Sequence, residues 1–173
     1  MKSTFVFTLI FFTSVLVYSQ DMTKFNLYNP ADDAKTEIES TVKRAKESGK
    51  HVMLQIGGNW CVWCARFNDF VTNDKSLDSL LNANFVVYHL NYSKENKNLD
   101  ILKKYSFPQR FGFPVFLVLN EKGELLHTQT SWYLEAGKGY DKEKVAAFFN
   151  DWGKKALDPA QYNDLGSQSC RGS

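Results

Sequence analysis

The apolar residues of this chain recur with two spacings, one typical of helices and one typical of buried strands. In residues 31–48 they return every three or four positions, as at Ala34, Ile38 and Val42, while Lys and Glu fill the other face. This spacing predicts an amphipathic helix, which Gly49 would end. Other stretches are short and almost wholly apolar, which predicts buried strands. These strands are expected at 51–56, 85–90 and 114–119.

Further periodic segments continue the alternation of helices and strands. Helices are predicted at 60–71, 76–81, 98–105 and 141–155, with Asp141 as the cap of the last one. Residues 124–130 are expected to pair back on the preceding strand as a hairpin, after a turn at 120–123. Alternation followed by a hairpin predicts an α/β fold, in which helices flank both faces of a central mixed β-sheet. One domain is expected at 31–158, between an N-terminal extension at 20–30 and a flexible C-terminal tail at 159–173.

The first nineteen residues have the pattern of a signal peptide. A positive start at Met1-Lys2 precedes an apolar run at 5–17, which is short for a membrane-spanning helix. Val17 and Ser19 suit the signal peptidase, so cleavage is expected after Ser19, with Gln20 as the near alternative. An uncleaved N-terminal anchor stays open as the other interpretation. After cleavage the protein is expected to be periplasmic or extracellular, without stable membrane insertion.

Composition and charge narrow the function classes. The chain has 173 residues, of which 43% are hydrophobic and 15% aromatic, so it can bury a packed core. Its net charge of +2, with acids and bases mixed along the chain, gives no reason to expect nucleic acid as a partner. Three cysteines are too few for a scaffold held together by disulfides. The close pair Cys61 and Cys64 therefore needs another explanation.

A C-x-x-C pair at the start of a helix is suited to thiol–disulfide exchange. Its spacing places both sulfurs on one turn, where they can close a small disulfide ring. Cys61 would lie at the helix N-terminus, where free N–H groups and the helix dipole stabilise the attacking thiolate. Cys64, one turn deeper, would resolve the mixed disulfide. This chemistry requires no metal and no cofactor beyond the Cys61–Cys64 disulfide itself. Half of a zinc site and a purely structural disulfide are the alternatives.

Four features together resemble the thioredoxin family. They are the strand at 51–56, the segment from Asn59 to Cys64, the Gly112-Phe113-Pro114 sequence before a strand, and the hairpin with Gly123. The resemblance covers about residues 49–152. It is greatest to exported members and to the C-terminal domain of membrane thiol:disulfide interchange proteins. It implies a thioredoxin-like fold and a protein-disulfide oxidoreductase acting on protein or peptide disulfides. A membrane electron donor of the interchange type is a further candidate partner.

The resemblance also assigns substrate-binding residues around the cysteine pair. It implies a cis Phe113–Pro114 bond, which would present the Phe113 backbone to an extended substrate. Trp60, Val62 and Trp63 would lie on the same substrate-facing side. The bulky Trp63 would restrict access to the buried sulfur, or would simply pack on the helix surface.

Two positions depart from the usual thioredoxin pattern. Thioredoxins usually hold a buried acid six positions before the first cysteine, where this chain has Gln55. They usually hold a lysine in the middle strand, near the position of His89. An amide cannot take a proton from Cys64 as a carboxylate would. Gln55 and His89 are the candidate residues at this proton-transfer position, and His89 or water would take the proton that Gln55 cannot accept.

The leading functional hypothesis is an exported thiol-disulfide oxidoreductase, with Cys61 as nucleophile and Cys64 as resolving cysteine, in the reductase or interchange direction. A non-catalytic protein-binding module is one alternative, because Gln55 replaces the usual acid. A disulfide oxidase or isomerase is the other, since direction depends on potential and partner. Cys170, in the C-terminal tail, is a free thiol, an intermolecular disulfide site or part of a non-native tail.

Overall fold

A computed structural model describes residues 25–162 of the chain. The predicted signal peptide at 1–19, its cleavage site and Cys170 lie outside the described residues. Four strands form one sheet in the order β2-β1-β3-β4. They are β1 (His51–Gly57), β2 (Phe85–Asn91), β3 (Val115–Leu119) and β4 (Leu125–Thr130). Strand β1 pairs parallel with β2 and antiparallel with β3, and β3 pairs antiparallel with β4. The predicted mixed sheet and its hairpin are confirmed.

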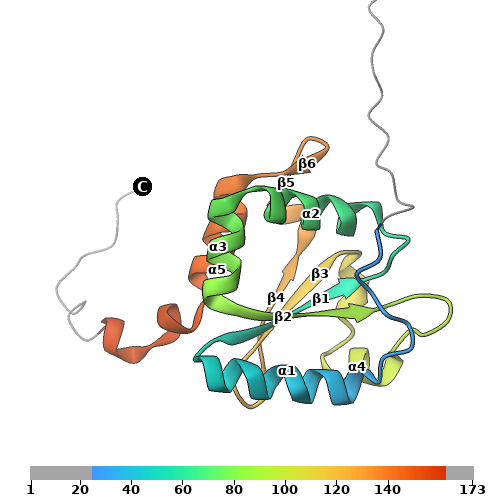
Figure 1. Ribbon diagram of the computed structural model, residues 1–173, viewed down its shortest axis with the longest axis horizontal. Coiled ribbons are helices and arrows are strands. Elements are labelled where there is room, and N and C mark those ends of the chain that lie inside the picture. Colours follow the sequence, from blue (N-terminus) through green and yellow to red (C-terminus); the bar gives the residue numbers. More distant parts are fainter. Residues whose placement is uncertain (1–24, 163–173) are drawn as a thin grey trace, which may run out of the picture.

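Helices cover both faces of this sheet, as Figure 1 shows. On one face lie α1 (Ala34–Ser48) and α4 (Leu99–Lys104), and on the other lie α2 (Val62–Asn73), α3 (Lys75–Asn84) and α5 (Lys142–Asp151). Successive side chains of β1 point to opposite faces, so Leu54 joins the core under α1 while Met53 joins the core under α2 and α5. Every residue of β1 and of β3 is buried, as expected for the two inner strands of the sheet.

Capping side chains decide where several helices begin and end. The helix predicted from residue 31 begins at Ala34, because the Asp33 side chain accepts hydrogen bonds from the N–H groups of Lys35 and Thr36. Gly49, at a φ of 66°, ends it as predicted. Asp141 caps α5 as predicted. The prediction that this last helix reaches residue 155 is wrong, because it ends at Asp151 and a separate 3₁₀ turn follows at Lys154–Leu157.

A small hairpin beyond β4 was missed by the sequence analysis. It follows the 3₁₀ turn η3 (Ser131–Leu134) and consists of β5 (Glu135–Ala136) and β6 (Gly139–Tyr140). Strands of two residues are too short to give a period-2 pattern. The hairpin lies over α2 (Figure 1), where the ring of Tyr140 packs edge-on against that of Phe67 at 5.0 Å. Its role in the fold is therefore to cover the helix that carries the cysteines.

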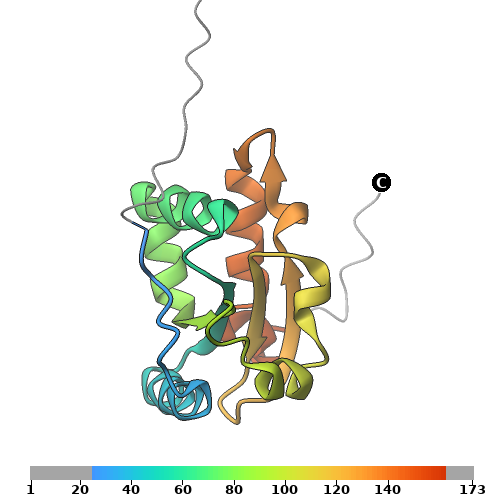
Figure 2. The same cartoon turned by 90° about the vertical axis from the view of Figure 1, so that its right-hand side faces the viewer.

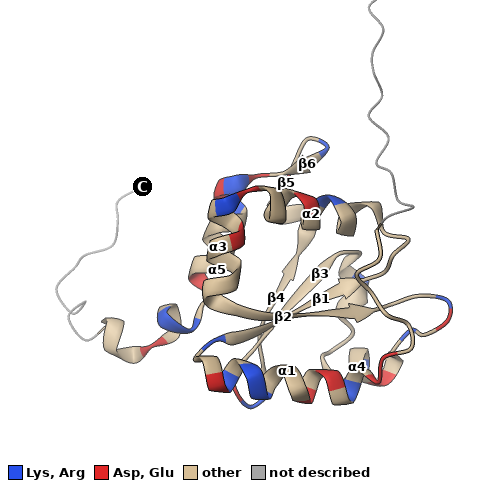
Figure 3. Ribbon diagram, in the orientation of Figure 1, with Lys and Arg blue, Asp and Glu red and all other residues tan. Residues whose placement is uncertain are grey.

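The charged residues are distributed without a dominant sign. Figure 3 shows basic and acidic positions interspersed on the helices, most clearly along α1, while the strands carry little charge. Among residues 25–162, no helix is both long and apolar enough to cross a membrane.

Candidate active site

Cys61 and Cys64 form a disulfide at the junction between β1 and α2. Their Cα atoms are 5.2 Å apart. Cys61 is the N-cap of α2, and its Sγ accepts a hydrogen bond from the backbone N–H of Cys64 at 3.1 Å. The helix therefore begins at Val62, two residues later than predicted, because the sulfur of Cys61 takes the capping position. This is the arrangement in which the helix N-terminus can stabilise a thiolate on Cys61.

The two sulfurs differ in their surroundings. Cys64 is completely buried, and Cys61 is 4% exposed. The residues on either side of Cys61 reach solvent, since Trp60 is 55% exposed and Val62 is 37% exposed. A substrate approaching this rim meets Cys61 first, and Cys64 lies beneath it.

An aromatic ledge lies beside the disulfide, and we define it as Trp60, Tyr92 and Phe113. The ring of Phe113 stands edge-on to Trp60 at 5.5 Å and lies 4.8 Å from the ring of Tyr92. The indole N–H of Trp60 donates to the Tyr92 carbonyl at 2.8 Å. Phe113 also packs against the buried cluster that contains Cys61 and Cys64. The Phe113–Pro114 bond is cis, as predicted, and Pro114 is buried directly before β3.

A hollow adjoins the ledge on its Tyr92 side. Its volume is about 430 Å³, and Trp60 and Tyr92 supply its aromatic wall. The loop that follows β2 supplies the remaining lining residues, which are Ser93, Lys94, Glu95 and Lys97. The hollow thus borders Trp60, the residue directly before Cys61.

Trp63 packs against the protein rather than extending from it. Its ring meets that of Tyr140 edge-on at 5.8 Å, and the guanidinium of Arg66 lies 4.9 Å from its centroid. The Tyr140 hydroxyl donates to the Trp63 carbonyl at 3.1 Å. These contacts agree with the packing alternative for Trp63. Its predicted role in limiting access to Cys64 stays a prediction.

Gln55 and His89 face each other on neighbouring strands, and Tyr28 contacts both. They are register partners between β1 and β2. Instead of pairing with His89, the Gln55 amide donates from Nε2 to the Tyr28 hydroxyl at 3.0 Å. The Tyr28 ring stands edge-on to the His89 ring, with centroids 5.5 Å apart. Tyr28 is 1% exposed and packs with Cys61 and Cys64 in one buried cluster.

Asn59 fastens the segment that carries Tyr28. Its Oδ1 accepts hydrogen bonds from the backbone N–H groups of Leu27 and Tyr28, both at 3.0 Å. Its Nδ2 donates to the Tyr28 carbonyl at 2.8 Å and to Asn26 Oδ1 at 2.9 Å. We call residues 25–30 the N-terminal strap. Figure 2 shows this strap, in blue, running from the end of the molecule that carries α2 towards α1.

The strap was missed as part of the site. Its residues lie within the predicted N-terminal extension, and six residues that mix apolar and polar side chains are too few to show which of them is buried. The sequence feature that could have indicated the strap is Asn59, directly before Trp60 and Cys61. Its amide can donate and accept hydrogen bonds, and could therefore hold another backbone segment beside the cysteines.

Tyr28, which packs with Cys64, and His89, which lies next to Tyr28, are both uncharged at neutral pH. Burial raises the pKa of Tyr28 well above its ordinary value, so its hydroxyl keeps its proton. Burial lowers the pKa of His89 to about 4, so its imidazole is neutral. Cys64 therefore packs beside a neutral phenol, which the Gln55 amide binds from the position where the family usually holds a carboxylate.

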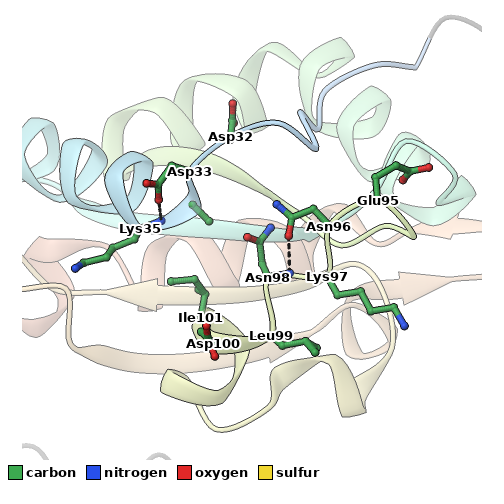
Figure 4. A pocket seen from close by; sticks show the side chains of 11 residues that line it. Asp32, Asp33, Lys35, Glu95, Asn96, Lys97, Asn98, Leu99, Asp100 and Ile101 are labelled. Carbon is green, nitrogen blue, oxygen red and sulfur yellow. Dashed lines mark hydrogen bonds between the residues drawn. The ribbon is translucent and has the colours of Figure 1, made fainter.

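A second, larger hollow lies away from the disulfide, and several of its polar side chains already cap a helix or hold a loop. Figure 4 shows it between the start of α1 and α4, with a volume of about 560 Å³. It is lined by acidic and basic side chains together, among them Asp33 and Lys35. Asp33 already caps α1, and Asn96 accepts from the backbone N–H of Asn98. Within residues 25–162 no group of three or more His, Cys, Asp or Glu side chains is arranged to hold a metal.

Comparison with known proteins agrees with this architecture. The family profile described as Thioredoxin-like matches residues 33–121, just over half of the chain. The chain belongs to the thioredoxin-like family. The fold class and the family resemblance predicted from the sequence are thus confirmed.

Curated relatives of this thioredoxin-like chain include larger proteins. The thiol:disulfide interchange protein DsbD of Actinobacillus pleuropneumoniae serotype 5b (strain L20) is 30% identical over 97 residues, which are 56% of this chain and 16% of that protein. The DsbD of Colwellia psychrerythraea (strain 34H) is 24% identical over 148 residues, 80% of this chain and 24% of that protein. The chain therefore spans a quarter or less of the length of these relatives.

Solved structures share the fold. A disulphide isomerase from Xylella fastidiosa Temecula1 matches with a TM-score of 0.63 and 24% identity, over 73% of this chain and 96% of that one. The reduced C-terminal domain of DsbD from Neisseria meningitidis matches with a TM-score of 0.52 and 18% identity, over 72% and 98% of the two chains. At these identities the likeness establishes the thioredoxin-like fold alone.

Proposed function

We propose that this chain is an exported protein-disulfide oxidoreductase that acts on protein or peptide disulfides in the reductase or interchange direction. The observation that carries the proposal is the Cys61–Cys64 disulfide at the first turn of α2. The Cys64 N–H that meets Cys61 Sγ would stabilise a thiolate there, because a charged acceptor strengthens a hydrogen bond. Membership of the thioredoxin-like family and the thiol:disulfide interchange relatives support the same reaction class.

The reaction uses the two cysteines in turn. The Cys61 thiolate attacks a substrate disulfide, forms a mixed disulfide and expels one substrate sulfur as a thiolate, which solvent protonates. The Cys64 thiol then loses its proton and attacks Cys61 Sγ. The second substrate sulfur leaves and takes up a proton. Two cysteine thiols are thereby oxidised to one disulfide, while the substrate disulfide is reduced to two thiols.

Substrate binding is assigned to the surface around Cys61. Trp60 and Val62 offer exposed apolar contact, and Trp63 borders them on the same turn. On the other side, the Phe113 backbone directly before the buried Pro114 would pair with an extended substrate chain. The 430 Å³ hollow beside Trp60 would take a neighbouring side chain. This arrangement suits peptide segments in which an apolar or aromatic residue lies close to the disulfide.

Cysteine substitutions test the proposal directly. All variants are made in a Cys170→Ser background. With dithiothreitol as the electron donor, Cys61→Ser should reduce insulin no faster than dithiothreitol alone. Cys64→Ser should retain the first attack and trap mixed disulfides, seen as a mass increase that a reductant removes. The Cys170→Ser protein is the control and should keep full activity. Undiminished reduction by both site variants would refute the proposal.

Export to the periplasm or to the cell exterior rests on the predicted signal peptide. Disulfides persist in such compartments, so a dithiol enzyme finds substrates there. A membrane protein of the interchange type is the candidate electron donor, as the names of the curated relatives suggest. N-terminal sequencing of the exported chain should begin at Gln20 or Asp21. A retained leader would contradict signal cleavage.

The direction of electron flow is measurable as a redox potential. Equilibrium with glutathione should give a value near that of thioredoxin, about −270 mV. A value near −120 mV, roughly that of a strong oxidant, would instead favour the oxidase or isomerase alternative. The binding-module alternative rests on Gln55 at the position where thioredoxins usually hold an acid. It would be favoured if the Cys61–Cys64 bond resisted reduction while peptides still bound.

A further inference from the structure

The buried sulfur of Cys64 and the hydroxyl of Tyr28 border the same small space above Gly57. A β-carbon placed on Gly57 would lie 2.4 Å from Cys64 Sγ and 2.9 Å from the Tyr28 hydroxyl oxygen. Gly57 is the last residue of β1, and the two side chains approach it from different segments: Cys64 from α2 and Tyr28 from the N-terminal strap. The absence of a side chain at Gly57 leaves room there for both the sulfur and the phenol.

The hydrogen bonds around Tyr28 determine which part of its hydroxyl remains available. The Gln55 amide donates to the phenol oxygen, so this oxygen acts as an acceptor on the Gln55 side. A phenol also has one proton to donate. The strap holds the phenol in place, because Asn59 binds the Tyr28 backbone through both its N–H and its carbonyl. The hydroxyl is therefore a fixed, uncharged donor beside a sulfur that must become a thiolate during exchange.

We propose that Tyr28 is a further catalytic residue, whose hydroxyl donates a hydrogen bond to the Cys64 thiolate in the resolving step. The proposal rests on the function proposed above for the cysteine pair. In this step Cys64 gives up its proton, its sulfur bonds to Cys61 Sγ, and the bond from Cys61 to the substrate breaks. The departing substrate sulfur takes the electron pair and a proton, so atoms and charge balance without another reactant. Tyr28 keeps its own proton throughout.

This role differs from that of a buried acid. A carboxylate accepts the proton of the resolving thiol, whereas a phenol that stays protonated stabilises the thiolate after the proton has left. Gln55 supports the phenol in this role, because its amide orients the oxygen without adding charge. The substitution of Gln55 for an acid and the presence of Tyr28 therefore have one explanation, in which a neutral pair replaces the charged group.

Titration of Cys64 alone tests the inference. In a Cys61→Ala, Cys170→Ser background, the ultraviolet absorbance of the thiolate reports the titration midpoint of Cys64. Tyr28→Phe keeps the ring and removes the hydroxyl, and should raise this midpoint by about one pH unit, which corresponds to a tenfold loss of thiolate. Tyr105→Phe is the matched control, because Tyr105 is also buried but its hydroxyl donates to Gly123, away from the disulfide. It should leave the midpoint unchanged.

Two results would overturn the inference. One is an unchanged midpoint in folded Tyr28→Phe, and the other is an equal rise in Tyr105→Phe. If Tyr28→Phe fails to fold, site-specific 3-fluorotyrosine at position 28 replaces it, since fluorine makes the phenol a stronger donor at nearly the same size. The midpoint should then fall, and an unchanged or raised value would contradict the role.

Kinetics separate this inference from the proposed function. In the Cys170→Ser protein, Tyr28→Phe should slow the release of glutathione from a mixed disulfide on Cys61 about tenfold, while the first attack by Cys61 keeps its rate. If the parent protein exchanged no disulfides, the proposed function would fail, yet the Cys64 titration would still report on Tyr28. If the parent protein were active and release were equally fast in Tyr28→Phe, only the role of Tyr28 would fail.

Discussion

The Tyr140 hydroxyl donates a hydrogen bond to the backbone carbonyl of Trp63 at 3.1 Å, although 77 positions separate the two residues in the chain. The bond joins the β5–β6 hairpin to the first turn of α2, directly between the two cysteines. Because Tyr140 is buried, Tyr140→Phe leaves that carbonyl without its partner and should lower the free energy of unfolding by about 1–2 kcal/mol. Urea unfolding at neutral pH measures the loss. Tyr133→Phe, at a position 59% exposed, should stay within about 0.5 kcal/mol of the parent. Equal losses in both variants would contradict the assignment.

Asn59 is expected to hold the N-terminal strap in place. Asn59→Ala removes four hydrogen bonds to the strap, so Tyr28 should spend more time away from the cysteines. The free energy of unfolding should fall by about 2–3 kcal/mol. Hydrogen exchange at Leu27 and Tyr28 should accelerate more than exchange within β1. Asn82→Ala, which removes one exposed bond to Asp78, is the matched control and should change neither quantity measurably. Unchanged exchange at the strap would show that Asn59 does not hold it.

Gly57 is expected to tolerate no side chain. In Gly57→Ala the new methyl group meets Cys64 Sγ and the Tyr28 hydroxyl well inside normal contact distance. Overpacking of this kind should cost about 1–3 kcal/mol in the free energy of unfolding of the oxidised protein. Gly139→Ala is the control, because nothing lies within 4 Å of the added carbon there. Both variants lose one glycine, so the difference between their unfolding midpoints isolates the clash. Equal stability of the two variants would contradict the close packing of Tyr28 and Cys64 around Gly57.

His89 should make the fold less stable in mild acid. Its pKa is lowered by burial to about 4 in the folded protein, against about 6.5 in an unfolded chain. Below pH 6.5 the unfolded state binds a proton that the folded state does not, so stability falls as the pH drops from about 6.5 towards 4. His89→Gln should lose less stability than the parent between pH 7 and pH 5. Parallel unfolding curves for the two proteins across that range would exclude this contribution.

Much of the fold could be predicted from the sequence, because its long elements carry strong periodic signals. Strand β1, one of the two inner strands, is almost continuously apolar apart from His51 and Gln55, and the first helix shows clear helical spacing. The predicted helix starts were less accurate where a capping side chain determines the first residue of the helix. Asp33 delays the start of α1, and Cys61 delays the start of α2. A cap is a hydrogen bond of one residue, so hydrophobic periodicity cannot locate it.

The cysteine pair and the cis bond before Pro114 could be predicted, whereas the environment of Cys64 could not. The family pattern directed attention to Gln55 and His89, which do lie opposite each other. Tyr28 contacts both, yet it lies 27 positions before Gln55 in a segment without periodicity. Such a contact depends on how the strap lies across the finished domain, and no local pattern of residues encodes it.

The strap bears on how this domain can be isolated for study. The match to the family profile begins at residue 33, which would be a natural place to start a recombinant fragment. A fragment cut there would contain both cysteines and the whole sheet but would lack Tyr28 and the backbone groups that Asn59 binds. Cys64 would then border an opening where the phenol had been. Redox measurements on that fragment would describe a more accessible sulfur than the one in the intact chain, so expression should start upstream of Phe25.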